Sequence, residues 1–221
     1  MKFKLINPAG IDNHGHKLSQ EQVDFFKNTV VRDKQGKLLA CFHGTHYFGF
    51  SDFDPAGMDR GFSWFTPDYS YAHAYVYEDD YDEQESGVYR CYVNIENPLN
   101  IGDVEALMVK RNAETFWLDD EELEETDFTD EFRDIAKKVK MTAKELYSSV
   151  EYKDDDAIFA ITRTKEFADI VLKLGYDGLI TKEFKGKSDC FAVPYTMPYN
   201  IKKCNNYKPT KSVYIDEEAE S

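Results

Sequence analysis

The stretch LLACFHGTHYFGF, residues 38–50, places His43 directly after a short apolar run and directly before Gly44. The turn-like sequence DKQGK leads into this run, which predicts a buried strand over residues 38–42 with His43 at its end. A core strand that ends in an imidazole and a glycine admits two interpretations. Either His43 caps the strand and Gly44 turns the chain, or the two residues belong to a functional site.

The composition bounds the class of protein. The chain has 221 residues, of which 42% are hydrophobic, enough for the core of one generous domain. No apolar run approaches the roughly 18 residues that cross a bilayer. The N-terminus lacks the long apolar core of a signal peptide. We therefore expect a cytoplasmic protein that does not use a membrane as a partner.

The net charge and the positions of the histidines and cysteines indicate which partners and metals to expect. The net charge is −15, which repels phosphate backbones and disfavours nucleic acid as a partner. The pair His14 and His16, in NHGH, has no second cluster to complete a metal site, so a polar surface loop is expected and no metal. The four cysteines are widely spaced, form no CxxC pair and are expected to pack as small hydrophobes: Cys41, Cys91, Cys190 and Cys204.

Helical and strand-like patterns alternate along the chain. Ser19 and Gln22 have the spacing of a capping box, which predicts the start of a helix. Thr66 precedes Pro67 and is predicted to be the N-cap of a second helix. The predicted strands are FSWF (62–65), VYRCYVNI (88–95, ended by ENPLNIGD), DGLIT (177–181), CFAVPY (190–195) and YNIKKC (199–204).

Residues 103–174 differ in character from the rest, because they are strongly charged and mostly helical in pattern. Gly175 is predicted to be a helix C-cap, and Asp177 a turn residue between helix and strand. The order of elements predicts an α+β protein with a mostly antiparallel core. We expect one domain over residues 1–221, with a helical acidic insertion at about 103–174.

A histidine after an apolar strand, aromatic residues on a strand–helix unit and an acid on a late strand resemble the ADP-ribosyltransferase fold. More narrowly, they resemble its histidine–tyrosine–glutamate branch, which includes the diphtheria-toxin and poly(ADP-ribose) polymerase-like enzymes. The resemblance implies a split antiparallel β core with flanking helices. Five phrases are similar to the ADP-ribosyltransferase domains of phage and mobile-element polyvalent proteins: SQEQVDFFKNTVVRDKQGKLLACFHGT, DRGFSWFTPDYSYAHAYV, VNIENPLNI, GYDGLI and YNIKKCNNYKPT.

This resemblance implies that NAD is the substrate. Cleaving NAD at the nicotinamide–ribose bond builds positive charge on the anomeric carbon, as in glycoside hydrolysis, and a carboxylate stabilises that charge. By resemblance, His43 hydrogen-bonds a ribose hydroxyl of the adenosine half, and Tyr75 stacks on the nicotinamide ring. Asp189 supplies the catalytic carboxylate. The residues that the resemblance implies for NAD binding are His43, Gly44, Thr45, Arg60, Trp64, Phe65 and Tyr75.

Two of these positions depart from the family's pattern. Trp64 stands where a tyrosine is expected and offers an N–H donor but no hydroxyl. Core packing is the alternative interpretation of Trp64 and Tyr75. Asp189 is one methylene shorter than the family's glutamate, and Glu183 is the alternative acid. A solvated carboxylate at a strand end is the other interpretation of Asp189.

The leading hypothesis is an NAD-dependent mono-ADP-ribosyltransferase that acts on a protein acceptor. By resemblance it is a toxin or effector in the cytoplasm of the producing or infected cell. Two alternatives stay open. In the first, water is the acceptor, which would make the protein an NAD glycohydrolase. In the second, the domain is a catalytically inactive module that binds NAD or another protein.

Overall fold

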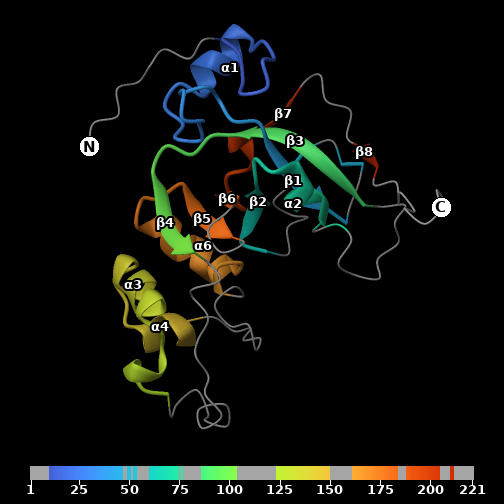
Figure 1. Ribbon diagram of the computed structural model, residues 1–221. Helices are drawn as coiled ribbons and strands as arrows, with labels where there is room; N and C mark the ends of the chain where they lie inside the picture. The colour runs from blue at the N-terminus through green and yellow to red at the C-terminus, as the bar shows by residue number, and fades with distance from the viewer. Residues whose placement is uncertain are drawn as a thin grey trace, which may run out of the picture.

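Two four-stranded sheets form the centre of the protein (Figure 1). The computed structural model describes residues 10–46, 49–50, 52–53, 60–74, 76, 86–103, 123–149, 161–183, 188–204 and 210–211. In the first sheet, β3 (Gly87–Val93) pairs antiparallel with β1 (Cys41–Thr45), β7 (Ile201–Lys203) and β8 (Thr210–Lys211). The second sheet has the order β2 (Phe62–Phe65), β6 (Ser188–Pro194), β5 (Gly178–Glu183) and β4 (Pro98–Asp103).

Antiparallel pairing dominates both sheets, and the β4–β5 pair is parallel. This arrangement confirms the predicted α+β fold with a split antiparallel core. The helices of the described residues are α1 (Gln20–Phe25), α2 (Tyr69–Ala74), α3 (Asp130–Lys138), α4 (Ala143–Ser148) and α6 (Lys165–Lys173), with short 3₁₀ turns η3 (Glu125–Asp127) and η4 (Pro198–Asn200).

The main core lies between the two sheets. Strand residues alternate between faces, and every second residue of β3 and β6 enters this core. The first sheet contributes Tyr89 and Cys91, and the second contributes Phe65, Phe191 and Val193. These side chains are at most 5% exposed. Phe65 of this core also contacts the ring of His43, around which the candidate site lies.

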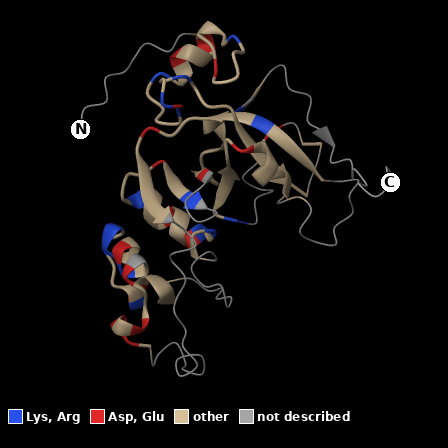
Figure 2. Cartoon of the chain, viewed as in Figure 1, with Lys and Arg blue, Asp and Glu red and all other residues tan. Residues whose placement is uncertain are grey.

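Helices cover the outer faces of both sheets. On the first sheet, Phe26 beside α1 packs with Leu38 and Tyr92. On the second sheet, Phe132 of α3 and Phe167 of α6 pack in one cluster with strand residues. In Figure 1, α1 lies at the top of the view, α3 and α4 lie below β4, and α6 lies near the centre beside β5. Charged residues of both signs gather on α1, α3 and α4, while most of the two sheets is drawn in tan (Figure 2).

The described part of the predicted insertion is a crossover connection. The helices α3, α4 and α6 lie between β4 and β5 in the chain, and parallel neighbours need such a crossover. Leu99 of β4 and Leu179 of β5 are buried in the same cluster as these helices. The helical block therefore covers one face of the second sheet. Its predicted boundaries, 103–174, and the single domain over 1–221 stay predictions.

Three local predictions were wrong in detail. The first strand starts at Cys41 and runs through His43 to Thr45, because residues 38–40 bond instead to loop backbone and to the Asn13 side chain. The second helix is capped by Asp68 rather than Thr66, since the Asp68 carboxylate accepts from the N–H groups of Ser70 and Tyr71. Pro98–Asp103, predicted to end a strand, is strand β4 itself.

The four cysteines are buried thiols, as predicted. Among the helices that the structure describes, none is both long enough and apolar enough to span a membrane.

Candidate active site around His43

A short bridge between the sheets places His43 next to β2. The N–H of Phe42 donates to the carbonyl of Thr66 at 2.6 Å, and the N–H of Thr66 donates back to the carbonyl of Phe42 at 3.0 Å. This bridge joins the first sheet to the end of β2. The side chain of His43 consequently meets the backbone of β2, one residue before Phe65.

Among the described residues, one hydrogen bond holds the imidazole of His43. Its Nδ1 lies 2.7 Å from the carbonyl oxygen of Trp64. Because a carbonyl only accepts, Nδ1 carries the proton, and Nε2 of the neutral ring is left as an acceptor. Burial lowers the pKa of His43, and the Trp64 carbonyl offsets this in part. The ring is therefore neutral at pH 7 and offers a hydrogen-bond acceptor suited to a hydroxyl group.

Aromatic rings surround this imidazole. Phe65 lies 5.3 Å from the His43 ring, and Phe53 meets it edge-on at 5.2 Å between centroids. Phe50 packs against Phe53 at 5.1 Å and against Tyr89 at 4.3 Å. Phe50, Phe53 and Tyr89 are not among the site residues predicted from the sequence. A signal for them exists in the aromatic density after His43 and in the alternation of β3, whose Tyr89 is the cross-strand partner of His43.

Trp64 contributes its carbonyl to the site, whereas its indole lies elsewhere. Successive strand residues point to opposite faces, and Phe65 faces the core between the sheets. Trp64 packs instead with Phe62 against the helical cluster on the outer face of the second sheet. The structure thus brings His43 and Phe65 together, and it separates the Trp64 ring from them.

Asp189 lies on the sheet face that is turned toward His43. Phe191, two residues further along β6, pairs with Phe65 and is buried in the core between the sheets. By strand alternation Asp189 occupies the same face, about 7 Å along the strand from Phe191. It is exposed, and its cross-strand partner is the exposed Lys182. Glu183 pairs with Ser188 at the end of β5, and its side chain lies outside what the structure describes.

The other predicted residues differ in their relation to His43. Thr45 lies two residues further along β1, so alternation puts it on the same face. Arg60 is exposed and precedes β2, at the end of that strand opposite to Phe65. The structure therefore does not bring Arg60 to His43. Tyr75 lies outside the described residues.

Gly44 has a packing reason to be glycine. A Cβ atom built on Gly44 lies 2.1 Å from the carbonyl oxygen of Ala72 and 3.0 Å from a methyl group of Val76. The helix α2 therefore rests directly on the backbone of β1. A side chain at this position requires α2 to move away from the strand that holds His43.

We expect Gly44→Ala to destabilise the protein by about 1–3 kcal/mol, because the added methyl group meets backbone rather than a flexible side chain. Urea denaturation of the purified variant measures this loss. Gly10→Ala is the matched control, since a Cβ atom there meets nothing within 4 Å. Equal stability of the two variants would contradict the close packing of α2 on β1.

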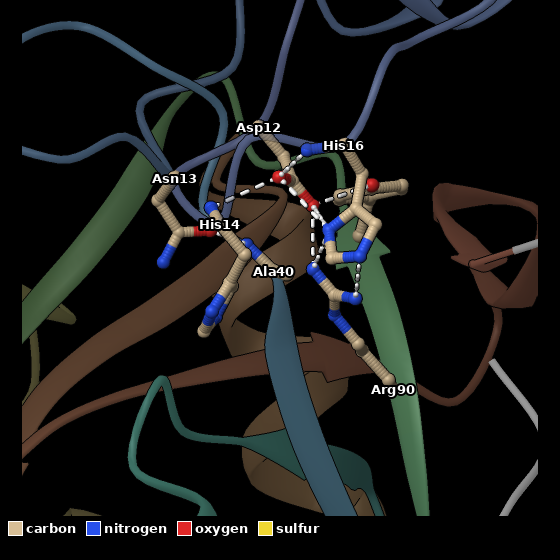
Figure 3. A network of polar contacts seen from close by, with 7 residues as sticks. Asp12, Asn13, His14, His16, Ala40 and Arg90 are labelled. Carbon is tan, nitrogen blue, oxygen red and sulfur yellow. Dashed lines mark hydrogen bonds and ion pairs between the residues drawn. The ribbon is translucent and has the colours of Figure 1, made fainter. Parts of the chain in front are cut away.

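A second polar cluster lies on the outer face of the first sheet (Figure 3). Asp12 is fully buried, and its Oδ2 accepts from Arg90 at 2.6 Å and from the Tyr92 hydroxyl at 2.9 Å. Its Oδ1 accepts from the backbone N–H groups of His14 and His16 at 2.9 and 2.8 Å. Burial alone raises the pKa of Asp12, but these hydrogen bonds and the Arg90 charge outweigh it and lower the pKa.

This cluster anchors the NHGH stretch, which is a surface loop as predicted. The side chain of His16 is 46% exposed, as a surface loop requires, but the loop is anchored through the buried Asp12 to strand β3. In the described part of the chain, no three His, Cys, Asp or Glu side chains are grouped as a metal site requires.

Comparisons with known proteins bear on this site. A family model described as "ADP-Ribosyltransferase in polyvalent proteins" matches residues 33–210, which is most of the chain. No curated protein matches. A solved structure titled "Crystal structure of an anti-CRISPR protein" is similar at 14% identity and a TM-score of 0.35, over 75% of this chain and 94% of that one. A likeness at that TM-score carries no argument about fold or function.

Proposed function

The chain belongs to the family of ADP-ribosyltransferases in polyvalent proteins, and on this premise we propose that it transfers a single ADP-ribose from NAD to a protein acceptor. The family's reaction uses NAD as its substrate. The observation that carries the proposal is the state of His43, whose Nδ1 proton is committed to the Trp64 carbonyl. Its Nε2 is then free of a proton and suited to accept a hydrogen bond from a ribose hydroxyl of NAD.

The proposed reaction breaks the bond between nicotinamide and the anomeric carbon. Nicotinamide leaves with the electron pair of that bond, and the ribose carbon gains positive charge in an oxocarbenium-like transition state. A nucleophile of the acceptor then bonds to this carbon and loses its proton. We assign the stabilising carboxylate to Asp189, because its strand position shares the sheet face of Phe191 and Phe65.

The remaining assignments follow from the resemblance and from charge. Tyr75 is proposed to stack on the nicotinamide ring, and Gly44 to offer its backbone to the carboxamide. Trp64 is proposed to act through its carbonyl, which holds His43. Arg60 has no assigned contact in this proposal, since it lies at the far end of β2. The net charge of −15 favours a protein over a nucleic acid as acceptor.

Labelled NAD tests the function directly. The full chain is incubated with NAD carrying label in the ADP-ribose half, with a cell lysate as the source of acceptors. Nicotinamide release and protein-bound label are measured together, and mass spectrometry counts the units on each labelled protein. Nicotinamide release with free ADP-ribose as the product indicates a glycohydrolase. No release, combined with stabilisation of the fold by NAD, indicates a binding module.

We expect Asp189→Asn to lower the rate of nicotinamide release by about 10²-fold or more, as losing one charge-stabilising group at a reacting centre does. The substitution keeps the size of the side chain and removes its charge. Glu183→Gln makes the same change six residues earlier in the chain and is expected to retain most of the activity. The opposite ranking of the two variants would assign the acid to Glu183.

A further inference from the structure

Tyr89 occupies a central place beside the candidate site without belonging to the set that the resemblance implies. It is the direct cross-strand partner of His43 in the β1–β3 pair. Its side chain is 2% exposed and lies in the core between the two sheets. A phenylalanine would fill this space equally well, so the hydroxyl group needs a separate explanation.

The hydroxyl group of Tyr89 bonds to the backbone of the segment that follows β1. It accepts from the N–H of Gly49 at 2.7 Å and donates to the carbonyl of Phe50 at 3.4 Å. Gly49 has a φ of +108°, a conformation that residues with a side chain rarely adopt. Tyr89 therefore ties Gly49 and Phe50, the residue after it, to β3.

The segment that Tyr89 holds carries Phe53, whose ring contacts His43, and Phe50, whose ring packs on both Phe53 and Tyr89. The Phe50 ring lies 4.3 Å from the Tyr89 ring, and the Phe53 ring lies 5.1 Å from that of Phe50. Phe53 then meets the rings of His43 and Phe65 at 5.2 and 5.6 Å. A continuous series of contacts thus runs from the Tyr89 hydroxyl to the imidazole.

We propose that Tyr89 is a positioning residue, whose hydroxyl group holds Phe50, and through it Phe53, so that the Phe53 ring stays against His43 and the imidazole is ready to receive NAD. The positioning itself rests on geometry alone, whereas its effect on NAD rests on the proposed function of His43. Without the hydroxyl group, the segment has to be ordered each time NAD binds. Part of the binding free energy is then lost to that ordering.

The test uses Tyr89→Phe, which keeps the ring and removes the hydroxyl group. The Michaelis constant for NAD is expected to rise about tenfold, a loss equivalent to one hydrogen bond, with kcat within about twofold. Independently of NAD, NMR titration of labelled histidine is expected to show the pKa of His43 moving up toward that of an exposed imidazole, because burial lowers it in the wild type.

Tyr92→Phe is the matched control. Tyr92 lies on the same strand, but its hydroxyl donates to Asp12 on the opposite face of the sheet. We expect it to leave both readouts unchanged. Phe53→Leu is a second variant that interrupts the same series of contacts closer to His43, and it should shift both readouts in the direction of Tyr89→Phe.

Each outcome decides the proposal. Wild-type values of both the His43 pKa and the Michaelis constant in Tyr89→Phe would overturn it, as would an equal shift in Tyr92→Phe. A shift of the His43 pKa in Tyr89→Phe and Phe53→Leu, in a protein whose wild type neither binds nor cleaves NAD, would support the positioning and reject the proposed function.

Discussion

His43→Asn is expected to reduce NAD cleavage by about 10²-fold or more while the protein stays folded, because a misplaced substrate costs at least that much at a reacting centre. The amide group of asparagine lies the same number of bonds from Cα as Nδ1 of histidine. It therefore still donates to the Trp64 carbonyl, which keeps the 2.7 Å interaction that orders β1 beside β2. It has no group in the place of Nε2.

His43→Gln makes the complementary change. Its amide group reaches the position of Nε2 but not that of Nδ1, so it restores an acceptor near the proposed ribose and leaves the Trp64 carbonyl without this donor. We expect partial activity and a loss of stability of about 1 kcal/mol, the net contribution of one hydrogen bond. Nicotinamide release and urea denaturation, measured on both variants, separate the roles of the two ring nitrogens.

The pH profile gives the same assignment an independent check. Protonation of Nε2 removes the acceptor, and burial holds the pKa of His43 below its ordinary value of about 6.5. Activity is therefore expected to persist at pH 6.5 and to fall only at lower pH.

Wild-type turnover in both His43→Asn and Tyr75→Ala would refute the assignment of the site.

Local sequence signals predicted the local structure well. Ser19 and Gln22 form the predicted capping box, with each side chain accepting from the other's N–H group. Gly175 follows α6 with a φ of +87°, as a C-cap glycine should. In these two cases the determining contacts lie within a few residues or follow from one residue's conformation. Asp177 lies between α6 and β5 as predicted, but its carboxylate accepts from the N–H groups of Glu96 and Asn97, about 80 residues earlier in the chain.

Contacts between segments that are far apart in the chain could not be predicted from the sequence. Residues Pro98–Asp103 form a strand because they pair in parallel with β5, about 80 residues later in the chain. The separation of the Trp64 ring from His43 depends on which face of β2 meets the first sheet, and both faces of β2 carry an aromatic residue. Phe50 and Phe53 have no periodic pattern, so only the fold shows that Phe53 packs on His43 and Phe50 on Phe53.

The Asp12 cluster is the clearest such case, because its partner Arg90 is 78 residues away in the chain. We expect Asp12→Asn to lower the free energy of unfolding by about 3 kcal/mol or more, since it leaves a buried guanidinium group without its counter-charge. The asparagine keeps Oδ1 for the two backbone N–H groups of the loop. It replaces Oδ2 by an amide donor that faces the donors of Arg90 and Tyr92.

Asp33→Asn is the matched control for this variant. The Oδ1 of Asp33 also accepts from the N–H groups two and four residues later, those of Gln35 and Lys37, both at 2.8 Å. Among the described residues, Asp33 forms no ion pair like that between Asp12 and Arg90. Its substitution is expected to cost under about 1 kcal/mol. The difference between the two variants therefore isolates the contribution of the Asp12 Oδ2 contacts.

The pH dependence of this difference identifies the carboxylate as its source. The pKa of Asp12 is lower in the folded protein than the ordinary value of about 3.9 for the unfolded chain. Its contribution is then fully present well above pH 4 and is lost as the pH falls through the folded-state pKa. The stability gap between wild type and Asp12→Asn, measured by urea denaturation at a series of pH values, should be widest near neutrality and close below pH 4.

The outcome also decides which residues form the cooperative unit. Asp12 precedes residues 33–210, the part of the chain that matches the family. It bonds to Arg90 of β3, the residue next to Tyr89, which is the cross-strand partner of His43. A large loss in Asp12→Asn, with one unfolding transition, means that the N-terminal segment folds as part of the sheet. Equal and small effects in Asp12→Asn and Asp33→Asn would instead mean that the sheet is stable without this ion pair.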